Sequence, residues 1–204
     1  MENKKFNIDK ITITQVREIM LKKHYSFYEK GNYNINIIGI RSENNISNSF
    51  DDYMMLIYKE NNEWVKKHYP ITTDAGTYWL KNPMNIKGTA ILIPNQYKSA
   101  YKIGTHKDYE ALTQKGEVEV WRDDNRDNIL DFDIAKKEWG YFGINIHRSN
   151  PYTESTQVHK WSAGCQVFKK VNDYNDFMNI CNLSKSYYGN SFTYTLLKTT
   201  DFKT

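Results

Sequence analysis

A histidine and a cysteine eighteen positions apart are the residues of this sequence best suited to covalent chemistry. His147 ends the segment Gly-Ile-Asn-Ile-His (143–147), and Cys165 ends the turn Trp-Ser-Ala-Gly-Cys (161–165) before an apolar run. A cysteine becomes a nucleophile when a neighbouring imidazole takes its proton, and a turn with glycine before the nucleophile can offer N–H groups to an oxyanion. A free cysteine beside Val167 is also a common small core residue. Residue types alone leave both interpretations open.

The order and spacing of these residues resemble the signature of the L,D-transpeptidase (YkuD-type) catalytic domain family. In that signature a histidine precedes a Ser-x-Gly-Cys turn that continues into an apolar run. The matching positions here are His147, Ser162, Gly164 and Cys165. The segment Thr-Asp-Ala-Gly-Thr-Tyr (73–78) echoes a turn that precedes the site in the family. The resemblance covers about residues 65–180, and the Trp-Ser-Ala-Gly-Cys motif is similar to a divergent, phage-like branch.

The resemblance implies a cysteine-dependent enzyme that acts on peptidoglycan stem peptides and needs no cofactor for catalysis. Cys165 would attack a carbonyl next to a D-residue and form a thioester, with His147 as the base. The carbonyl of the residue after the histidine orients the imidazole in the family, and that residue here is Arg148. The N–H groups of Gly164 and Cys165 would form the oxyanion hole, and Ser162 would shape the turn.

Two positions depart from the family pattern. Ala163 stands where the family has His or Asn, and Val167 stands where it has an arginine that contacts a substrate carboxylate; Arg148 or Lys160 are candidate replacements for that cation. The absence of these groups argues against crosslinking to an amine acceptor more than it argues against thioester formation. The expected activity is therefore hydrolysis of stem peptides. A crosslinking L,D-transpeptidase and a non-catalytic wall-binding or structural protein that keeps the fold are the alternatives.

Several side chains near these motifs are candidates for binding the substrate. The aromatic residues that could line a groove for peptide or glycan are Tyr78, Trp79, Tyr152 and Trp161. Tryptophan is more often a core residue, which is the alternative interpretation. His159, six positions before Cys165, could reach the site, or it could be an exposed loop residue.

An acidic loop over residues 123–133 carries oxygen ligands at alternate positions. The residues that follow calcium-loop spacing are Asp123, Asn125, Asp127, Ile129 (through its carbonyl) and Asp131. Asn128 replaces the usual glycine, and Ile134 stands where a bidentate glutamate is expected. The loop is therefore either a structural Ca²⁺ site or a solvated polar turn. The sequence contains no pairing of His and Cys residues that would indicate a zinc site.

Many short strands and two helices must position these motifs, which predicts an α+β single domain with a β-rich, mixed-sheet, sandwich-like core. Apolar spacing predicts a helix over 14–30, capped by Thr12 or Thr14 and followed by Gly31. A second helix is expected over 172–183, after Cys165, with Cys181 on its apolar side. Strands are expected at 34–41, 51–58, 63–69, 78–80, 89–93, 117–121, 141–147 and 191–198.

The chain is expected to divide at residue 60. Residues 1–60 would form a helix and hairpin extension packed on the core, and residues 61–204 would form the catalytic domain. The family resemblance does not explain the first part, whose role stays open between a lid, a core extension and a partner surface.

Composition narrows the class of protein. Aromatic residues make up 15% of the 204 residues, a share that excludes collagen-like and disordered chains. The net charge of +4 comes from dispersed Lys and Arg, so nucleic-acid binding is not expected, although Tyr and Lys alternate over 97–102. With no apolar leader or span, we expect a monomer made in the cytoplasm with reduced cysteines, which acts at the cell wall after lysis or escorted release.

Overall fold

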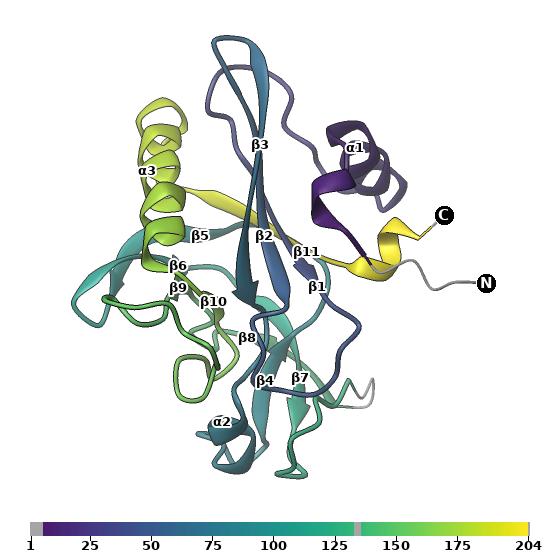
Figure 1. The fold of residues 1–204 in the computed structure, drawn as a ribbon, viewed down its shortest axis with the longest axis vertical. Helices are drawn as coiled ribbons and strands as arrows, with labels where there is room; N and C mark the ends of the chain where they lie inside the picture. Colours follow the sequence, from purple (N-terminus) through teal and green to yellow (C-terminus); the bar gives the residue numbers. More distant parts are fainter. Residues whose placement is uncertain (1–5, 133–135, 204) are drawn as a thin grey trace.

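A closed β-barrel forms the body of the protein (Figure 1). The structure, a computed structural model, describes residues 6–132 and 136–203. The barrel order is β1-β11-β5-β6-β9-β10-β3-β2. Its strands are β1 (Asn36–Arg41), β2 (Asp52–Glu60), β3 (Glu63–Thr72), β5 (Gln96–His106), β6 (Tyr109–Gln114), β9 (Ile146–Arg148), β10 (Gln166–Phe168) and β11 (Phe192–Lys198). Two pairs, β1–β11 and β9–β10, are parallel, and the other neighbours are antiparallel.

A second, smaller sheet and a few helices complete the described chain. The sheet has the order β4-β7-β8, with β4 (Thr89–Leu92), β7 (Val118–Asp123) and β8 (Lys137–Gly140). The helical elements are η1 (Ile8–Lys10), α1 (Ile13–Lys22), α2 (Thr77–Lys81), α3 (Val171–Tyr188) and η3 (Thr199–Phe202). The prediction of a β-rich α+β protein is confirmed. Its core is a closed barrel, which leaves no free sheet edge, and not a sandwich of two open sheets.

The first helix is shorter than its apolar pattern predicts. Thr12 caps α1 in a capping box, because its hydroxyl accepts from the Gln15 N–H at 3.1 Å while the Gln15 side chain accepts from the Thr12 N–H at 2.9 Å. The helix ends at Lys22, where His24 turns into the left-handed region with φ 59°. The Tyr25 N–H then bonds the Met20 carbonyl at 2.8 Å, a closure that stops the helix well before Gly31.

Other expected elements were confirmed, shortened or wrong. The hairpin of β2 and β3 and the strands β1, β4, β7 and β11 lie where the sequence predicts them, and the second helix is longer than expected. Residues 78–80 belong to the helix α2 and not to a strand. The expected strand 141–147 is reduced to β9, because Gly143 has a φ of 70° that interrupts extended pairing. Strands β5, β6, β8 and β10 were not predicted.

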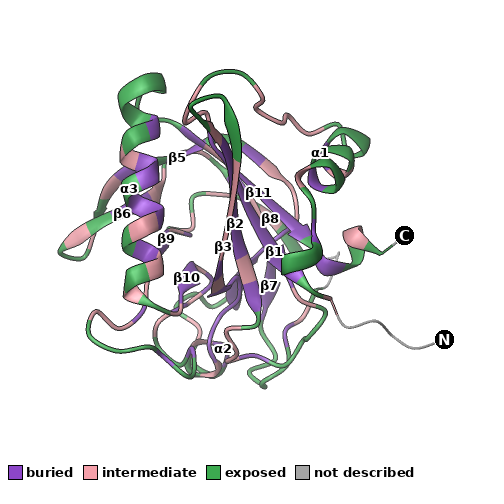
Figure 2. Ribbon diagram, turned by 45° about the horizontal axis from the view of Figure 1, so that its top comes forward, coloured by how far each residue is buried: buried purple, intermediate pink, exposed green. Residues whose placement is uncertain are grey.

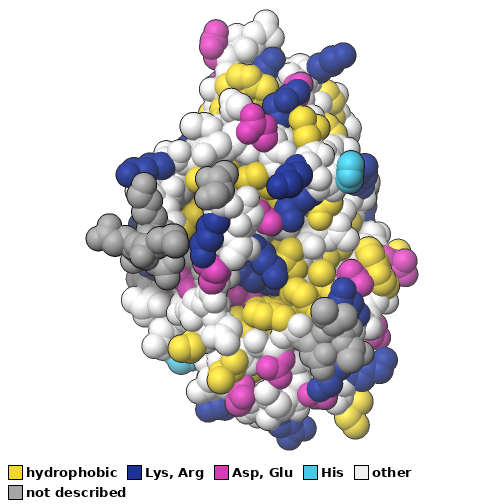
Figure 3. Space-filling view, turned by 90° about the vertical axis from the view of Figure 1, so that its right-hand side faces the viewer, with side chains coloured by type: hydrophobic (Ala, Val, Ile, Leu, Met, Phe, Trp, Pro, Cys, Tyr) yellow, Lys and Arg dark blue, Asp and Glu magenta, His cyan; other side chains and the backbone are white. Residues whose placement is uncertain are grey.

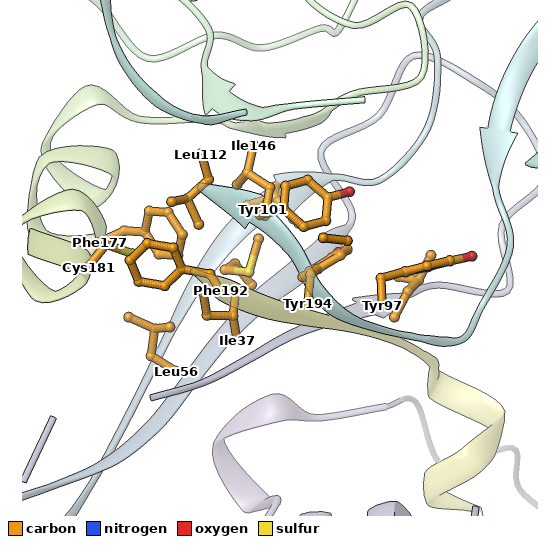
Figure 4. Packing of buried hydrophobic residues seen from close by; sticks show 14 of the residues in the cluster. Ile37, Leu56, Tyr97, Tyr101, Leu112, Ile146, Phe177, Cys181, Phe192 and Tyr194 are labelled. Atoms are coloured by element: carbon orange, nitrogen blue, oxygen red, sulfur yellow. The ribbon is translucent and has the colours of Figure 1, made fainter. Parts of the chain in front are cut away.

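Three apolar clusters of the described residues hold the fold together (Figure 2). The largest cluster fills the barrel and the space under α3, and a second lies under α1. The third joins Leu80 of α2 to Ile91 of β4 and Trp121 of β7. Cys181 lies in the largest cluster, fully buried with Phe177 of the same helix and with Leu56 and Ile37 of the barrel (Figure 4). The prediction that Cys181 is a packing residue is confirmed.

The N-terminal part of the chain contributes strands to the barrel. β1 pairs with β11 on one side and with β2 on the other, and β2 pairs with β3 along its whole length. The expected boundary at residue 60 therefore falls in the turn between two paired strands of one barrel. Helix α1 lies outside this barrel, next to η3 (Figure 1).

Charges are mixed over the surface. Figure 3 shows positive and negative side chains interspersed on the face that carries α1 and the C-terminus. This agrees with the even spread of Lys and Arg along the sequence. Among the described residues, no helix combines the length and the apolar character needed to cross a bilayer.

Candidate active site

A cavity of about 750 Å³ lies between the barrel and the small sheet, and both Cys165 and His147 line it. The parallel pairing of β9 and β10 explains how residues eighteen positions apart come together. Val167 lies opposite His147 in this pairing, and Cys165 comes directly before β10. The Gln166 N–H also donates to the Asn145 carbonyl at 2.9 Å, which extends the pairing toward the cavity.

The Cys165 thiol is held between two backbone groups. Its sulfur lies 3.4 Å from the Asn145 N–H, which donates to it, and 3.5 Å from the Gly143 carbonyl, which accepts from it. Burial raises the pKa of Cys165 to about 11, although the Asn145 N–H and Lys107 favour the thiolate. The resting residue is therefore a neutral thiol at physiological pH.

The His147 ring has one nitrogen fixed and one available. Its Nδ1 lies 2.8 Å from the Arg148 carbonyl oxygen. A carbonyl can only accept, so Nδ1 carries the proton and Nε2 is the basic nitrogen of the neutral ring. Burial, followed by the nearby His106, lowers the pKa of His147 to about 3. This Nδ1 contact is the one that the family resemblance implies for the Arg148 carbonyl.

The turn before Cys165 depends on Ser162 and on a glycine. Gly164 has φ +118°, and a Cβ there would lie 2.2 Å from the Ala90 carbonyl oxygen. The Ser162 hydroxyl accepts from the Gly164 N–H at 3.1 Å and donates to the Cys165 carbonyl at 2.8 Å. The expected oxyanion hole is corrected in one respect, because the Gly164 N–H is already bonded. Within residues 6–132 and 136–203, no group accepts from the Cys165 N–H.

A buried polar network supports this turn from inside the barrel. The Gln166 side chain accepts from the Tyr194 hydroxyl at 2.7 Å, and both residues are fully buried. Gln166 also donates to the Thr73 carbonyl at 3.4 Å, and Arg41 donates to the same carbonyl at 2.9 Å. No local sequence pattern indicates this network, because its members come from strands and loops that meet only when the barrel closes.

A second histidine lies against His147. The rings of His106 and His147 stack with centroids 4.2 Å apart and an interplanar angle of 17°. His106 Nδ1 is also 3.1 Å from the Asn145 side-chain amide, and His106 lines the same cavity as Cys165. No sequence motif indicates His106, because it ends a strand (β5) that the sequence pattern does not predict.

The predicted substrate-binding residues divide into two groups. Trp79 and Trp161 line the cavity, and the Trp79 indole donates to the Lys160 carbonyl at 3.1 Å. Tyr78 and His159 are outside the lining that the described residues form. Tyr78 packs edge-on against Trp79, and His159 is exposed, with its N–H bonded to Asn48.

Further cavity residues were not predicted. Aromatic side chains come from β8 and the loop after it, namely Trp139, Tyr141 and Phe142, and cationic side chains come from Lys107 and Arg122. Lys160, one of the two candidate replacements for the family arginine, lines the cavity, whereas the Arg148 guanidinium lies over the Tyr109 ring at 4.0 Å. Tyr152 is largely exposed.

The acidic loop folds around its own hydrogen bonds. The Asn125 amide donates to Asp131 at 2.8 Å, and the Asp131 N–H donates to Asp123 at 3.0 Å. Asp127 accepts from the Ile129 N–H at 2.6 Å. Among the described residues, no group of three or more His, Cys, Asp or Glu is placed to hold a metal ion; Asp133 and Ile134 lie outside those residues. Calcium binding by this loop stays a prediction.

One atom of the acidic loop lacks a hydrogen-bond partner. The Oδ1 of Asp123 is buried and unpaired within the described part of the chain. Burial raises the pKa of Asp123 to about 6, and the neighbouring Asp131 and Asp127 add to that rise. Either a bound cation or a proton on the carboxyl group would give this buried oxygen a stabilising interaction.

The fold and the site together define a β-barrel domain with a cysteine and a histidine in one cavity. Comparisons with protein-family models, with curated proteins and with solved structures found no match. The geometry of the cavity and the sequence motif are therefore the observations that bear on function.

Proposed function

We propose that this protein is a cysteine-dependent hydrolase of peptidoglycan stem peptides, working through a Cys165 thioester with His147 as the base. One observation carries the proposal. Cys165 and His147 line one cavity, and the Arg148 carbonyl holds His147 Nδ1 so that Nε2 is left as the basic nitrogen. A nucleophile, a base and a group that orients the base are the parts that acyl transfer needs.

In the first step, the Cys165 sulfur attacks the carbonyl carbon of the scissile amide while its proton passes to His147 Nε2. Both groups are neutral at rest, so proton transfer accompanies attack and no stored thiolate is required. A carbon–sulfur bond forms, the carbon–nitrogen bond breaks, and His147 returns the proton to the leaving amine.

In the second step, water attacks the thioester. His147 Nε2 takes a proton from the water as its oxygen bonds to the carbonyl carbon. The carbon–sulfur bond breaks, and the proton returns to the Cys165 sulfur. The Cys165 N–H, which has no partner among the described residues, is the donor available to the developing oxyanion.

The walls of the cavity suit a peptide that carries charged groups. The indoles of Trp79 and Trp161 offer flat apolar surfaces, and Lys107, Arg122 and Lys160 offer positive charge for substrate carboxylates. Arg122 is already bonded to Glu138 at 2.8 Å, so the two lysines are the freer cations of this set. In this proposal the protein acts as a monomer on the cell wall, which it reaches after lysis or with an escort.

Digestion of purified peptidoglycan sacculi tests the proposal. Released muropeptides are identified by mass spectrometry after incubation with the wild type, Cys165→Ala and Cys181→Ala. The last variant is the matched control, because it removes a cysteine that lies in the core and outside the cavity. We expect cleavage by the wild type and by Cys181→Ala, and none by Cys165→Ala.

Other outcomes would support the alternatives. Capture of an added D-amino acid into the product would indicate an L,D-transpeptidase. Equal binding of the wild type and Cys165→Ala to sacculi, with no release by either, would indicate a wall-binding protein. Unchanged cleavage by Cys165→Ala would reject the cysteine mechanism.

A further inference from the structure

His106 enters the cavity from the end of β5 and contacts both halves of the proposed machinery. Its ring stacks on the His147 ring at 4.2 Å, and its Nδ1 lies 3.1 Å from the Asn145 side-chain amide. Asn145 is itself the residue whose backbone N–H donates to the Cys165 sulfur. One side chain therefore links the base and the nucleophile through two separate contacts.

The Asn145 contact defines where the His106 proton lies. The Gln114 N–H donates to Asn145 Oδ1 at 2.9 Å, so the amide nitrogen of Asn145 is the atom that faces His106. An amide nitrogen only donates, and Nδ1 of His106 must therefore be an unprotonated acceptor. A proton added at Nδ1 would place two donors against each other and break this contact.

The stacked contact makes a second proton on the pair unfavourable. Two imidazolium rings at this separation would repel each other strongly in a partly buried site. His147 must accept a proton from Cys165 in the proposed reaction, so it can do this readily only while His106 is neutral. A proton on His106 would oppose that transfer.

We propose that His106 is a positioning residue of the Cys165–His147 site: while neutral it holds Asn145 and the His147 ring in place, and when protonated it releases Asn145 and opposes a proton on His147. The kinetic consequence rests on the proposed function, whereas the coupling between the two rings and Asn145 does not.

The groups around His106 determine the direction of its pH response. Lys107 neighbours it on the β5–β6 hairpin, Tyr109 meets it edge-on at 5.6 Å, and His147 faces it from β9. No carboxylate stabilises the cationic form among the causes of its shift, and burial followed by Lys107 lowers the pKa of His106 below 6.5. His106 is therefore neutral at neutral pH and becomes protonated in acid.

A pH titration by NMR tests the coupling without a substrate. The imidazole signals of the five histidines and the Asn145 side-chain amide are followed in the wild type, His106→Phe and His106→Gln. Phe keeps a ring over His147 but carries no charge, and Gln keeps an acceptor for Asn145 without titrating. His147→Gln assigns the His147 signal, and dispersed amide spectra show that each variant is folded.

The expected result has two parts. The midpoint of His147 rises by about one pH unit in His106→Phe, because the like charge is gone while the ring cover stays. The Asn145 amide signal follows the His106 titration in the wild type and is constant over that range in His106→Gln. An identical His147 midpoint in the wild type and His106→Phe, or an Asn145 amide that ignores the His106 titration, would overturn the proposal.

The activity measurement separates this inference from the proposed function. Stem-peptide release by the wild type should fall in acid as His106 takes up a proton. The fall should move to lower pH in His106→Gln, since the only histidine of the pair that remains is His147, whose pKa burial lowers to about 3. If release by His106→Gln falls at the same acidic pH as release by the wild type, the positioning role of His106 is contradicted. No release by the wild type at any pH, together with the expected NMR result, would reject the hydrolase and retain the coupling.

Discussion

Gly164 lies against the backbone of Ala90 so closely that a Cβ on the glycine would be 2.2 Å from the Ala90 carbonyl oxygen. This approach joins the turn before Cys165 to β4 of the small sheet, whose Thr89 and Ala90 also line the cavity. Together with the φ of +118°, it explains why glycine must precede Cys165. The glycine of the motif is therefore required for packing. Its N–H is bonded to Ser162 and is not free to bind an oxyanion.

The first prediction concerns this glycine. Gly164→Ala should lower the free energy of unfolding by more than the ~1–3 kcal/mol of backbone strain alone, because the new methyl group also displaces β4. Gly143→Ala is the matched control, since Gly143 also has a positive φ but has nothing within 4 Å of an added Cβ. Denaturant unfolding of both variants checks this, and equal losses would contradict the proposed close packing.

The second prediction concerns the reactivity of Cys165 in the protein without substrate. Because burial raises the pKa of Cys165 to about 11, alkylation by iodoacetamide should be slow at neutral pH. The alkylation rate should rise by about tenfold per pH unit up to about pH 11. The rate of an ordinary thiol levels off above its pKa of about 8.5. Cys181, fully buried, should stay unmodified in the folded protein. A rate that levels off near pH 8.5 would contradict the raised pKa, and a rate that levels off below pH 7 would show that the resting site stores a thiolate.

The third prediction concerns the base. His147→Gln should reduce stem-peptide release by about 10²- to 10⁴-fold, the usual contribution of a general base. His159→Gln is the control, because His159 is exposed and outside the cavity lining, and it should retain wild-type release. Equal losses in the two variants, measured as initial rates on the same sacculi, would contradict the assignment of His147.

The fourth prediction concerns the acidic loop. If Ca²⁺ satisfies the buried Oδ1 of Asp123, the ion binds the native state and must raise the melting temperature. A stabilisation of about 1 kcal/mol corresponds to roughly 2–4 °C for a chain of this size. Asp127→Asn should reduce the rise, because it removes one negative charge from the loop. Identical melting temperatures with calcium and with chelator would leave the loop as a polar turn.

The sequence motif located two residues of the cavity, His147 and Cys165, better than it located their surroundings. His147, Ser162 and Cys165 lie on one short stretch of chain, and their spacing alone indicated a turn beside a strand. His106 joins them from 41 positions before His147, and only the closure of the barrel brings β5 and β6 beside β9. A local pattern cannot report that kind of contact.

Local propensity also misled where tertiary context prevailed. Tyr78 and Trp79 favour a strand by composition, yet they lie in the helix α2 (Thr77–Lys81), whose N-cap is Gly76. A Cβ on Gly76 would lie 2.0 Å from the His159 carbonyl oxygen, so the start of this helix is packed against a distant loop. The expectation that the Gly164 N–H is free to hold an oxyanion was wrong for a similar reason, because its hydrogen bond to Ser162 is visible only in three dimensions.

Trapping the acyl-enzyme on Cys165 tests the central claim most directly. The wild type is mixed with stem peptides, quenched in acid and digested with trypsin. Cys165 then lies in the peptide 161–169 and Cys181 in the peptide 171–185. We expect the mass of an acyl group on the first peptide alone, removed by neutral hydroxylamine as a thioester is, and absent from Cys165→Ala. Stem-peptide cleavage by the wild type with no adduct on 161–169, and undiminished cleavage by Cys165→Ala, would contradict the account.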